Sequence, residues 1–190
     1  MGKTFKSVIS YLYFPICILL YPLLIKNSLA MADFRQWQEH FKIKELGTFR
    51  AFCYLFAYYP NYRSVFYFRQ NRLCEYTVGL LFNPLVTLCI SRGCVIEGGV
   101  ITEHGYGAVI TAKKIGKNFF FHQNCTVGFN HGGYPEIGDN VTLYAGAVVA
   151  GPIKIGHNVK IGANAVVLQD VPDDCVVYGN PCVIKKHKVK

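Results

Sequence analysis

The sequence contains few charged residues, and acidic ones are especially scarce. Only 16% of its 190 residues are charged, while 52% are hydrophobic and 15% aromatic, which excludes a generally disordered chain. Eleven acidic residues stand against 20 Lys and Arg, for a formal net charge of +9. This excess favours an anionic partner. Composition alone leaves that partner open between nucleic acid, anionic lipid and a phosphorylated small molecule.

The sequence also lacks any C-x-x-C pair, although it has eight cysteines. A zinc ribbon or a thioredoxin-type redox motif therefore has no support. Several of the cysteines lie inside apolar runs, such as Cys17 in PICILL and Cys125 in NCTVG. We interpret them as small buried thiols of a reducing compartment, and we expect no bound metal.

Charge is absent from residues 8–25, an apolar stretch interrupted by Pro15 and Pro22. Its length is at the lower limit for a transmembrane helix. Three interpretations remain open: an anchor that dips into or spans a membrane, a helix buried against the rest of the protein, and a cleaved signal segment. The basic residues that flank the stretch are Lys3, Lys6 and Lys26.

Residues 1–90 are aromatic and basic, and we expect them to form an α-helical leader. Helices are predicted over 33–44, with Asp33 as N-cap, and over 48–59 and 62–72. Pro60 and the residue after it break the last two apart. The mixture of Phe, Tyr and Arg on these helices predicts either an aromatic core with a basic rim or a surface that lies on anionic lipid.

Residues 91–190 follow a different pattern, with an apolar residue at every sixth position. That period fits neither a helix nor a simple strand and is typical of a solenoid. Four of the positions begin an Ile-Gly-x-Asn tetrad, in which a short strand points Ile inward before Gly and Asn turn a corner. The periodic positions are Val109, Ile115, Phe121, Val127, Ile137, Leu143, Val149, Ile155, Ile161 and Val167. The positions two residues earlier are also expected to point inward: Cys125, Val141, Ala147, Ile153, Val159 and Ala165.

Three such hexads make one triangular coil of 18 residues, and successive coils stack about 4.8 Å apart by strand pairing. The step from Val127 to Ile137 is ten residues instead of six. The excess predicts a loop, FNHGGYP, at a corner of the solenoid. In repeat proteins such insertions gather on the binding face.

The repeat region resembles the hexapeptide-repeat acyltransferases, and within them the serine acetyltransferase-like group that includes surface-polysaccharide O-acetyltransferases. The resemblance is carried by EHGYGAVI at 103–110, PEIGDN at 135–140 and VPDDCVVYGNP at 171–181. It implies a left-handed parallel β-helix after an α-helical N-terminal extension, assembled as a homotrimer with acetyl-CoA between neighbouring subunits. The cofactor contacts that it implies are Gly128, Ala145, Lys160 and Ala163. On electrostatic grounds we add Lys185, from a basic end that also holds Lys186, Lys188 and Lys190.

Acyl transfer from a thioester to a hydroxyl needs a base, and histidine is the commonest one near neutral pH. The family motif places that base at His104, preceded by Glu103. His131, in the predicted loop, is a second candidate, because loops on rigid scaffolds often carry function. His122 lies 18 residues beyond His104 and is expected on the same face. The remaining histidines, which we interpret as surface residues, are His40, His157 and His187.

Two departures from the family pattern concern the acceptor. Cys89 stands where serine acetyltransferases have a supporting Asp, and Tyr134 stands where they have a second His. We therefore expect an acetyl-CoA-dependent O-acetyltransferase acting on a saccharide hydroxyl of a surface polysaccharide or its precursor. It is expected in the cytoplasm, at the inner face of the cytoplasmic membrane, with no nucleic-acid partner.

Three alternatives stay open. The first is serine O-acetyltransferase of cysteine biosynthesis, with an amino-acid hydroxyl as acceptor. The second is a metal hydratase of the γ-carbonic anhydrase type, with His104, His122 and His131 around zinc across a subunit boundary. The third is a non-catalytic scaffold.

Overall fold

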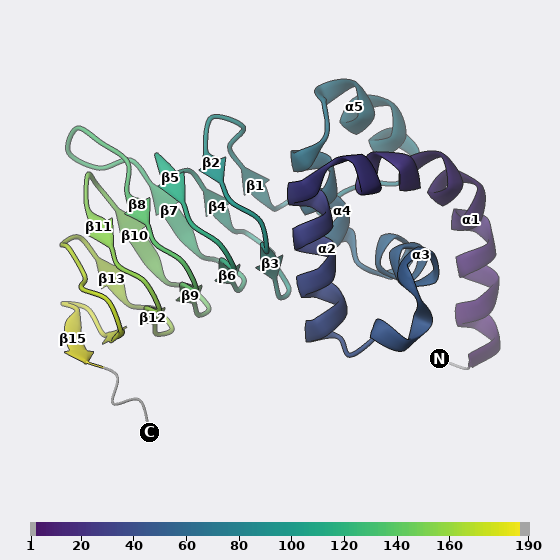
Figure 1. Ribbon diagram of the computed structural model, residues 1–190. Coiled ribbons are helices and arrows are strands. Elements are labelled where there is room, and N and C mark those ends of the chain that lie inside the picture. The colour runs from purple at the N-terminus through teal and green to yellow at the C-terminus, as the bar shows by residue number, and fades with distance from the viewer. Residues whose placement is uncertain (1–2, 187–190) are drawn as a thin grey trace. The chain divides into compact units, whose positions relative to one another are not determined.

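The computed structural model describes residues 3–186, with the side chains of residues 13–186. The chain divides into two compact units, one ending at Leu85 and the other beginning at Val86. The first is α-helical and the second is a β-solenoid of about five turns, which confirms the expected fold class (Figure 1). The helices are α1 (Lys3–Lys26), α2 (Ser28–His40), the short 3-10 helix η1 (Lys44–Leu46), α3 (Thr48–Tyr58), α4 (Pro60–Arg69) and α5 (Arg72–Leu81).

The helical unit is built around aromatic side chains. Phe52 and Phe56 of α3 are fully buried and pack against rings from α2 and α4. The helices expected over 48–59 and 62–72 are thus present as α3 and α4. Pro60 begins α4 because its fixed φ and missing N–H suit the first turn of a helix. The sequence did not predict α5.

The helix α1 runs through Pro15 and Pro22 without ending. One of its faces is buried within the helical unit, at Cys17, Leu20 and Leu24. Within the described residues, no single helix combines the length and apolarity that crossing a membrane requires, whereas residues 13–26 and 28–40, bent by 111°, meet those criteria as a pair.

The expected N-cap at Asp33 is wrong. The helix α2 begins five residues earlier, where the side chain of Asn27 accepts hydrogen bonds from the N–H groups of Leu29 and Ala30 at 3.1 and 3.0 Å. Asp33 lies inside the helix and is 1% exposed. Its carboxylate accepts a hydrogen bond from Nε of Arg69 on α4 at 2.7 Å. A buried carboxylate needs such a partner, and the pairing with Arg69 is what allows Asp33 to be buried inside the helix.

The solenoid has three parallel sheets, here called A, B and C. Sheet A contains β1 (Cys89–Ile90), β4 (Val109–Ile110), β7 (Thr126–Gly128), β10 (Val148–Ala150) and β13 (Val166–Val167). Sheet B contains β2 (Val95–Ile96), β5 (Lys114–Ile115), β8 (Glu136–Ile137) and β11 (Lys154–Ile155). Sheet C contains β3 (Ile101–Thr102), β6 (Phe120–Phe121), β9 (Thr142–Leu143), β12 (Lys160–Ile161), β14 (Cys175–Tyr178) and β15 (Val183–Lys186), of which only the last is antiparallel to its neighbour.

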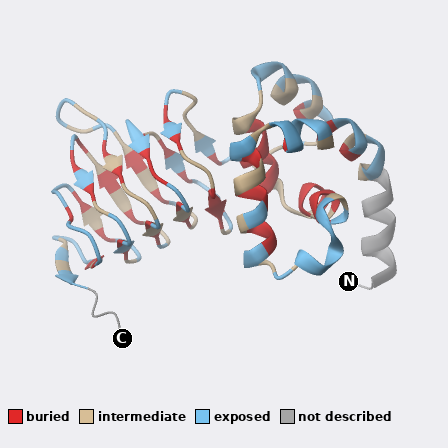
Figure 2. Cartoon of the chain, in the orientation of Figure 1, coloured by how far each residue is buried: buried red, intermediate tan, exposed pale blue. Residues whose placement is uncertain are grey.

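The chain passes from sheet A to B to C and back to A in every coil, so that the solenoid has an A–B, a B–C and a C–A corner. Figure 2 shows buried and exposed positions alternating along the strands, as inward and outward side chains require. The expected corner geometry is confirmed by left-handed backbone at four asparagines of the tetrads, with φ of 56–57°. They are Asn118, Asn140, Asn158 and Asn164.

Both expected sets of inward side chains are buried, with the exception of Val109. Val109 is 43% exposed and its neighbour Ile110 is fully buried. The step from Ile110 to Ile115 is only five residues, because this A–B corner is one residue shorter than the hexad requires. A slip of one residue turns every side chain of a strand to the opposite face.

The buried ion pair generates a stability prediction. In Arg69→Met the carboxylate of Asp33 stays buried without its partner, and we expect a loss of about 3–5 kcal/mol in the free energy of unfolding. Urea denaturation followed by circular dichroism measures this loss. The matched control is Arg35→Met, an exposed arginine of α2, which should change stability by less than about 0.5 kcal/mol. An Arg69 variant as stable as the control would contradict the assigned role of the pair.

Candidate functional site

The C–A corner holds the residue expected to act as base. His104 follows β3, is exposed, and has a left-handed backbone with φ of 66°. The carbonyl of Glu103 accepts a hydrogen bond from the N–H of Gly105 at 2.9 Å, which closes the turn around His104. The imidazole is therefore presented to solvent from a rigid corner.

The expectation that His122 stacks on His104 is wrong by one residue. Strand β3 pairs with β6 so that Thr102 lies opposite Phe121. Continuing that register places His122 opposite Glu103. Beyond Glu103 the corner is two residues longer than in the next coil, and the N–H of Asn124 donates to the carbonyl of Tyr106 at 2.7 Å, so that Gln123 lies opposite Tyr106. The coil from Ile101 to Phe120 has 19 residues, one more than the regular repeat. The ring of His122 instead stacks on Tyr144 of the next coil, with centroids 5.4 Å apart.

Two small residues continue a line that begins at Tyr106, in the same turn as His104. The registers of β6 with β9 and of β9 with β12 place Gln123, Ala145 and Ala163 opposite one another. Backbone hydrogen bonds tie these corner turns together, from Gly146 N–H to Gln123 O and from Asn164 N–H to Ala145 O, both at 3.0 Å. Three coil spacings separate the two ends of this line, about 14 Å. We call the line Tyr106–Gln123–Ala145–Ala163 the corner column, and His104 lies in the turn at its first coil.

The two candidate lysines lie on one face of sheet C, beside the far end of the corner column. Lys160 of β12 lies opposite Val176 of β14, which in turn lies opposite Lys185 of β15. Both lysines are exposed and are two strand spacings apart, about 10 Å. A hydrogen bond with Tyr178 raises the pKa of Lys185, whose Nζ lies 5.4 Å from the centre of that ring. The face is thus cationic, as a phosphate site requires. Lys188, Lys190 and His187 lie outside the described residues.

Gly128 and His131 belong to the A–B corner, at the opposite edge of sheet A. Gly128 ends β7, and the predicted loop follows it. Asn130 and Gly133 exchange backbone hydrogen bonds at 3.1 and 3.3 Å, and His131 is exposed between them. Within one chain, sheet A separates these two residues from His104 and the corner column. Sheet A likewise separates His131 from His104 and His122. Within residues 13–186, no group of three or more His, Cys, Asp or Glu side chains could hold a metal ion.

The positions that depart from the family pattern also lie along sheet A. Cys89 is exposed on β1, opposite Val109. Tyr134 is exposed at the end of the loop, where its ring makes an edge contact with Phe129 at 5.4 Å.

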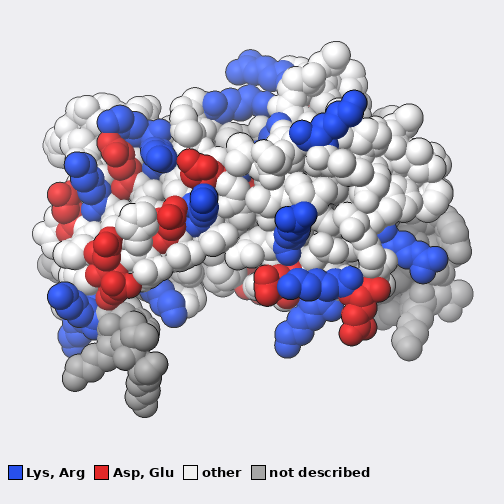
Figure 3. All heavy atoms as spheres, viewed as in Figure 1, with Lys and Arg blue, Asp and Glu red and all other residues white. Residues whose placement is uncertain are grey.

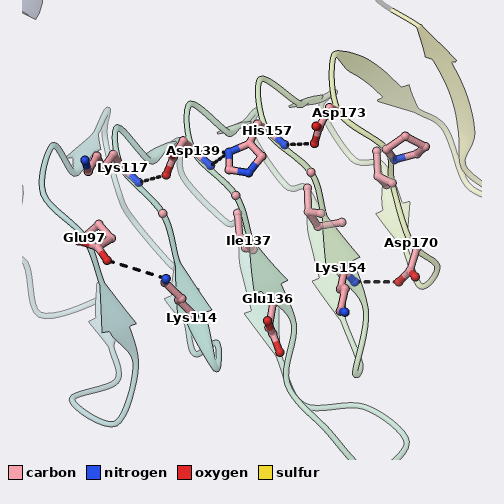
Figure 4. A pocket seen from close by; sticks show the side chains of 16 residues that line it. Glu97, Lys114, Lys117, Glu136, Ile137, Asp139, Lys154, His157, Asp170 and Asp173 are labelled. Atoms are coloured by element: carbon pink, nitrogen blue, oxygen red, sulfur yellow. Dashed lines mark hydrogen bonds and ion pairs between the residues drawn. The ribbon is translucent and has the colours of Figure 1, made fainter.

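A shallow groove of about 820 Å³ lies elsewhere, on the outer face of sheet B and the B–C corner. Figure 4 shows that its charged side chains come from successive coils and pair with one another, as Lys114 does with Glu97 at 4.0 Å. Asp139 likewise accepts a hydrogen bond from the N–H of Lys117 at 2.7 Å. None of the expected site residues lines the groove. These pairings join the coils, and we assign the groove no part in the chemistry.

Sequence reasoning missed Gln123, the corner-column residue one coil beyond the turn that holds His104. Its side-chain oxygen is buried and has no hydrogen-bond partner within the described residues. The signal that could have identified it is the spacing of the flanking strands, since Thr102 and Ile110 are eight positions apart and Phe121 and Val127 only six.

Comparison with known proteins agrees with this architecture. The family described as bacterial transferase hexapeptide (six repeats) matches residues 134–169. A serine acetyltransferase of Staphylococcus epidermidis is 35% identical over 149 residues, which cover 75% of this chain and 66% of that protein. One of Mycobacterium tuberculosis is 42% identical over 118 residues, covering 60% and 52%. The chain spans 40–66% of the length of these and other curated serine acetyltransferases that it matches.

Solved structures share the fold. Soybean serine acetyltransferase, as apoenzyme, superposes with a TM-score of 0.67 at 27% identity, covering 83% of this chain and 68% of that one. A serine acetyltransferase in complex with CoA superposes with a TM-score of 0.57 at 22% identity, covering 90% and 73%. The solenoid, its tetrads and these matches together show that the chain belongs to the hexapeptide-repeat transferases, in the serine acetyltransferase family.

Proposed function

We propose that the protein transfers the acetyl group of acetyl-CoA to the hydroxyl of an acceptor. The observation that carries this proposal is the alignment of His104, the small residues Ala145 and Ala163, and the pair Lys160 and Lys185 along one edge of the solenoid. A base, a narrow track for an extended chain and a cationic end follow one another in the order that a long phosphorylated thioester requires.

Each part of this edge has a distinct task. The acceptor oxygen bonds to the carbonyl carbon of the acetyl-CoA thioester, the C–S bond breaks, and the CoA thiolate leaves and takes up the proton that His104 removed. His104 takes the proton of the attacking hydroxyl, a step for which a neutral imidazole is suited near pH 7. The small side chains of Ala145 and Ala163 leave their corner turns open to close approach by the pantetheine arm. Lys160 and Lys185 bind phosphate as cations.

A homotrimer would complete the site. The described outer face of sheet A is uncharged along Val109, Thr126, Val148 and Val166, which suits it for contact with other subunits. If the sheets A of three subunits face a threefold axis, the C–A corner of each subunit adjoins the A–B corner of the next. Gly128 and the loop of one subunit would then lie beside the corner column of its neighbour.

Serine is the first candidate acceptor. The relatives named above are all serine acetyltransferases. Two serine acetyltransferases of this fold, from Neisseria gonorrhoeae and soybean, have been solved in complex with serine. The shared chemistry is the same proton removal by His104 from a primary hydroxyl.

A saccharide hydroxyl is the second candidate, favoured by the side chains around the expected acceptor position. Serine carries a carboxylate, yet residues 103–108 and 129–135 contain no Lys or Arg to bind it. Cys89 and Tyr134 replace the Asp and His of the family pattern. Exposed aromatic rings stand there instead, at Tyr106, Phe129 and Tyr134, and such rings stack on the apolar faces of sugars.

An acceptor panel tests the proposed reaction. Purified full-length protein with acetyl-CoA should release CoA in the presence of serine or of a saccharide from a panel of simple sugars and oligosaccharides. Mass spectrometry of the acetylated product identifies the acceptor. Release with serine alone supports the first candidate, and release with a sugar alone supports the second. Absence of release with every acceptor, from protein that still binds CoA, would contradict the transferase proposal.

The base is tested by His104→Asn, since asparagine tolerates the left-handed backbone that this position requires. We expect turnover to fall by about 10²–10⁴-fold while CoA affinity is kept, because a general base adds that much to the rate but does not hold the donor. The control is His157→Asn, an exposed histidine of the B–C corner, which should leave turnover unchanged. If His131→Asn proves inactive and the His104 variant does not, the base lies in the loop.

The shared site is tested by mixing inactive subunits. A Cβ added at Gly128 meets no atom closer than 3.9 Å apart from its chain neighbours, so we expect Gly128→Phe to fold but to block the donor. Each site needs one intact C–A corner and one intact A–B corner. Subunits of the Gly128 and His104 variants, unfolded and refolded together in equal amounts, should therefore recover about a quarter of wild-type activity. Light scattering should give the mass of a trimer. Recovery of no activity from correctly sized mixed trimers would place each site within one subunit.

A further inference from the structure

The helix α1 has two apolar faces, and only one of them is used inside the helical unit. Cys17, Leu20 and Leu24 are at most 3% exposed and pack toward α3. The opposite face is uncovered within the unit, with Ile18 at 52% and Leu19 at 71% exposure. Its exposed side chains follow the helical repeat without interruption by a polar residue: Phe14, Pro15, Ile18, Leu19, Pro22 and Leu23.

This uncovered face, which we call the α1 stripe, has a second apolar helix nearby. Tyr13 of α1 contacts Phe82 at the C-terminal cap of α5, with ring centroids 4.8 Å apart. On α5 the side chains of Leu73, Tyr76 and Leu80 are 62–78% exposed. Exposed apolar surface on neighbouring helices often marks a site of interaction with a protein or a membrane.

The charged residues of the N-terminal segment that holds the α1 stripe have one sign. Residues 1–32 contain Lys3, Lys6 and Lys26 and no acidic residue, and the first carboxylate, Asp33, is buried against Arg69. Lys26 is exposed directly after the stripe. Residues 1–85 carry ten Lys and Arg against four Asp and Glu, a net +6 of the whole chain's +9. On the face drawn in Figure 3, acidic side chains are absent from the upper edge of the helical unit.

We propose that the α1 stripe binds the surface of an anionic lipid bilayer, with the helix lying in the plane of the membrane. A helix that packs one face against its own unit cannot have lipid on every side. If only the α1 stripe is buried, at the level of the headgroups, its apolar side chains enter the acyl boundary. The ammonium groups of neighbouring lysines can then bind lipid phosphates. This binding is independent of the acetyl transfer, and it would hold the solenoid near membrane-bound acceptors.

Vesicle flotation of the full-length protein tests the proposal. With phosphatidylcholine vesicles containing about a third phosphatidylserine, the protein should float, and it should float less with pure phosphatidylcholine. The double variant Ile18→Glu, Leu19→Glu should lose at least about tenfold in the bound fraction, because two charges enter the acyl boundary. The matched control is Leu46→Glu, a 42% exposed leucine of η1 outside the stripe, which should float like the wild type.

Two further measurements distinguish a loss of lipid binding from a loss of folding and from self-association. Circular dichroism should give all variants the same helix content, since the substituted side chains are exposed. Lack of flotation by the wild type, or equal loss by Leu46→Glu, overturns the proposal. So does a drop in solution mass of the double variant without lipid, which would assign the α1 stripe to contact between copies of this chain. Loss of flotation with full CoA release activity leaves the proposed function intact.

Discussion

The structure of the solenoid depends on the register between successive coils. Every strand except β15 pairs with the strand one coil away, and an asparagine ladder holds the B–C corners in line with those pairings. The side-chain amide of Asn118 donates to Asn140, Asn140 donates to Asn158, and Asn158 donates to Asp174, each at 2.9 Å. Each of these asparagines has a left-handed backbone that a β-branched residue would not adopt. The ladder therefore fixes both the turn and its height along the axis.

That register decides which side chains can act together. His104 and Ala163 are 59 positions apart in the sequence, yet they share one edge because three coils bring the chain back to the same corner. Lys160 and Lys185 share a face because β14 stacks on β12 one coil later and the antiparallel β15 then pairs with β14. In such a scaffold, backbone pairing between strands sets the positions of the functional groups, and their side chains stay free to move at the site.

The two units accommodate their polar side chains in different ways. In the solenoid, polar side chains lie outside and pair between coils, so that few need burial. In the helical unit, an aromatic core encloses Asp33 and Arg69, and Arg63 donates hydrogen bonds to the carbonyls of Phe56 and of Asn83, the latter at 2.8 Å. Burial lowers the pKa of Arg63, but its donors remain paired with carbonyl oxygens. The apolar surplus of α1 stays on the surface of this unit, where it is free to bind a partner.

The sequence by itself determined the solenoid, its inward side chains and its corner residues, because a six-residue repeat leaves little choice of fold. It also determined α3 and α4 through their apolar spacing. It did not determine the inward side of β4 or the neighbours of His104, since both depend on corner lengths that differ from the repeat by one or two residues. The cap of α2 was likewise decided by tertiary structure, because only the fold brings Arg69 to Asp33. Which of the candidate residues lie together, and which are separated by sheet A, follows from strand pairing across coils, a constraint that no local stretch of sequence contains.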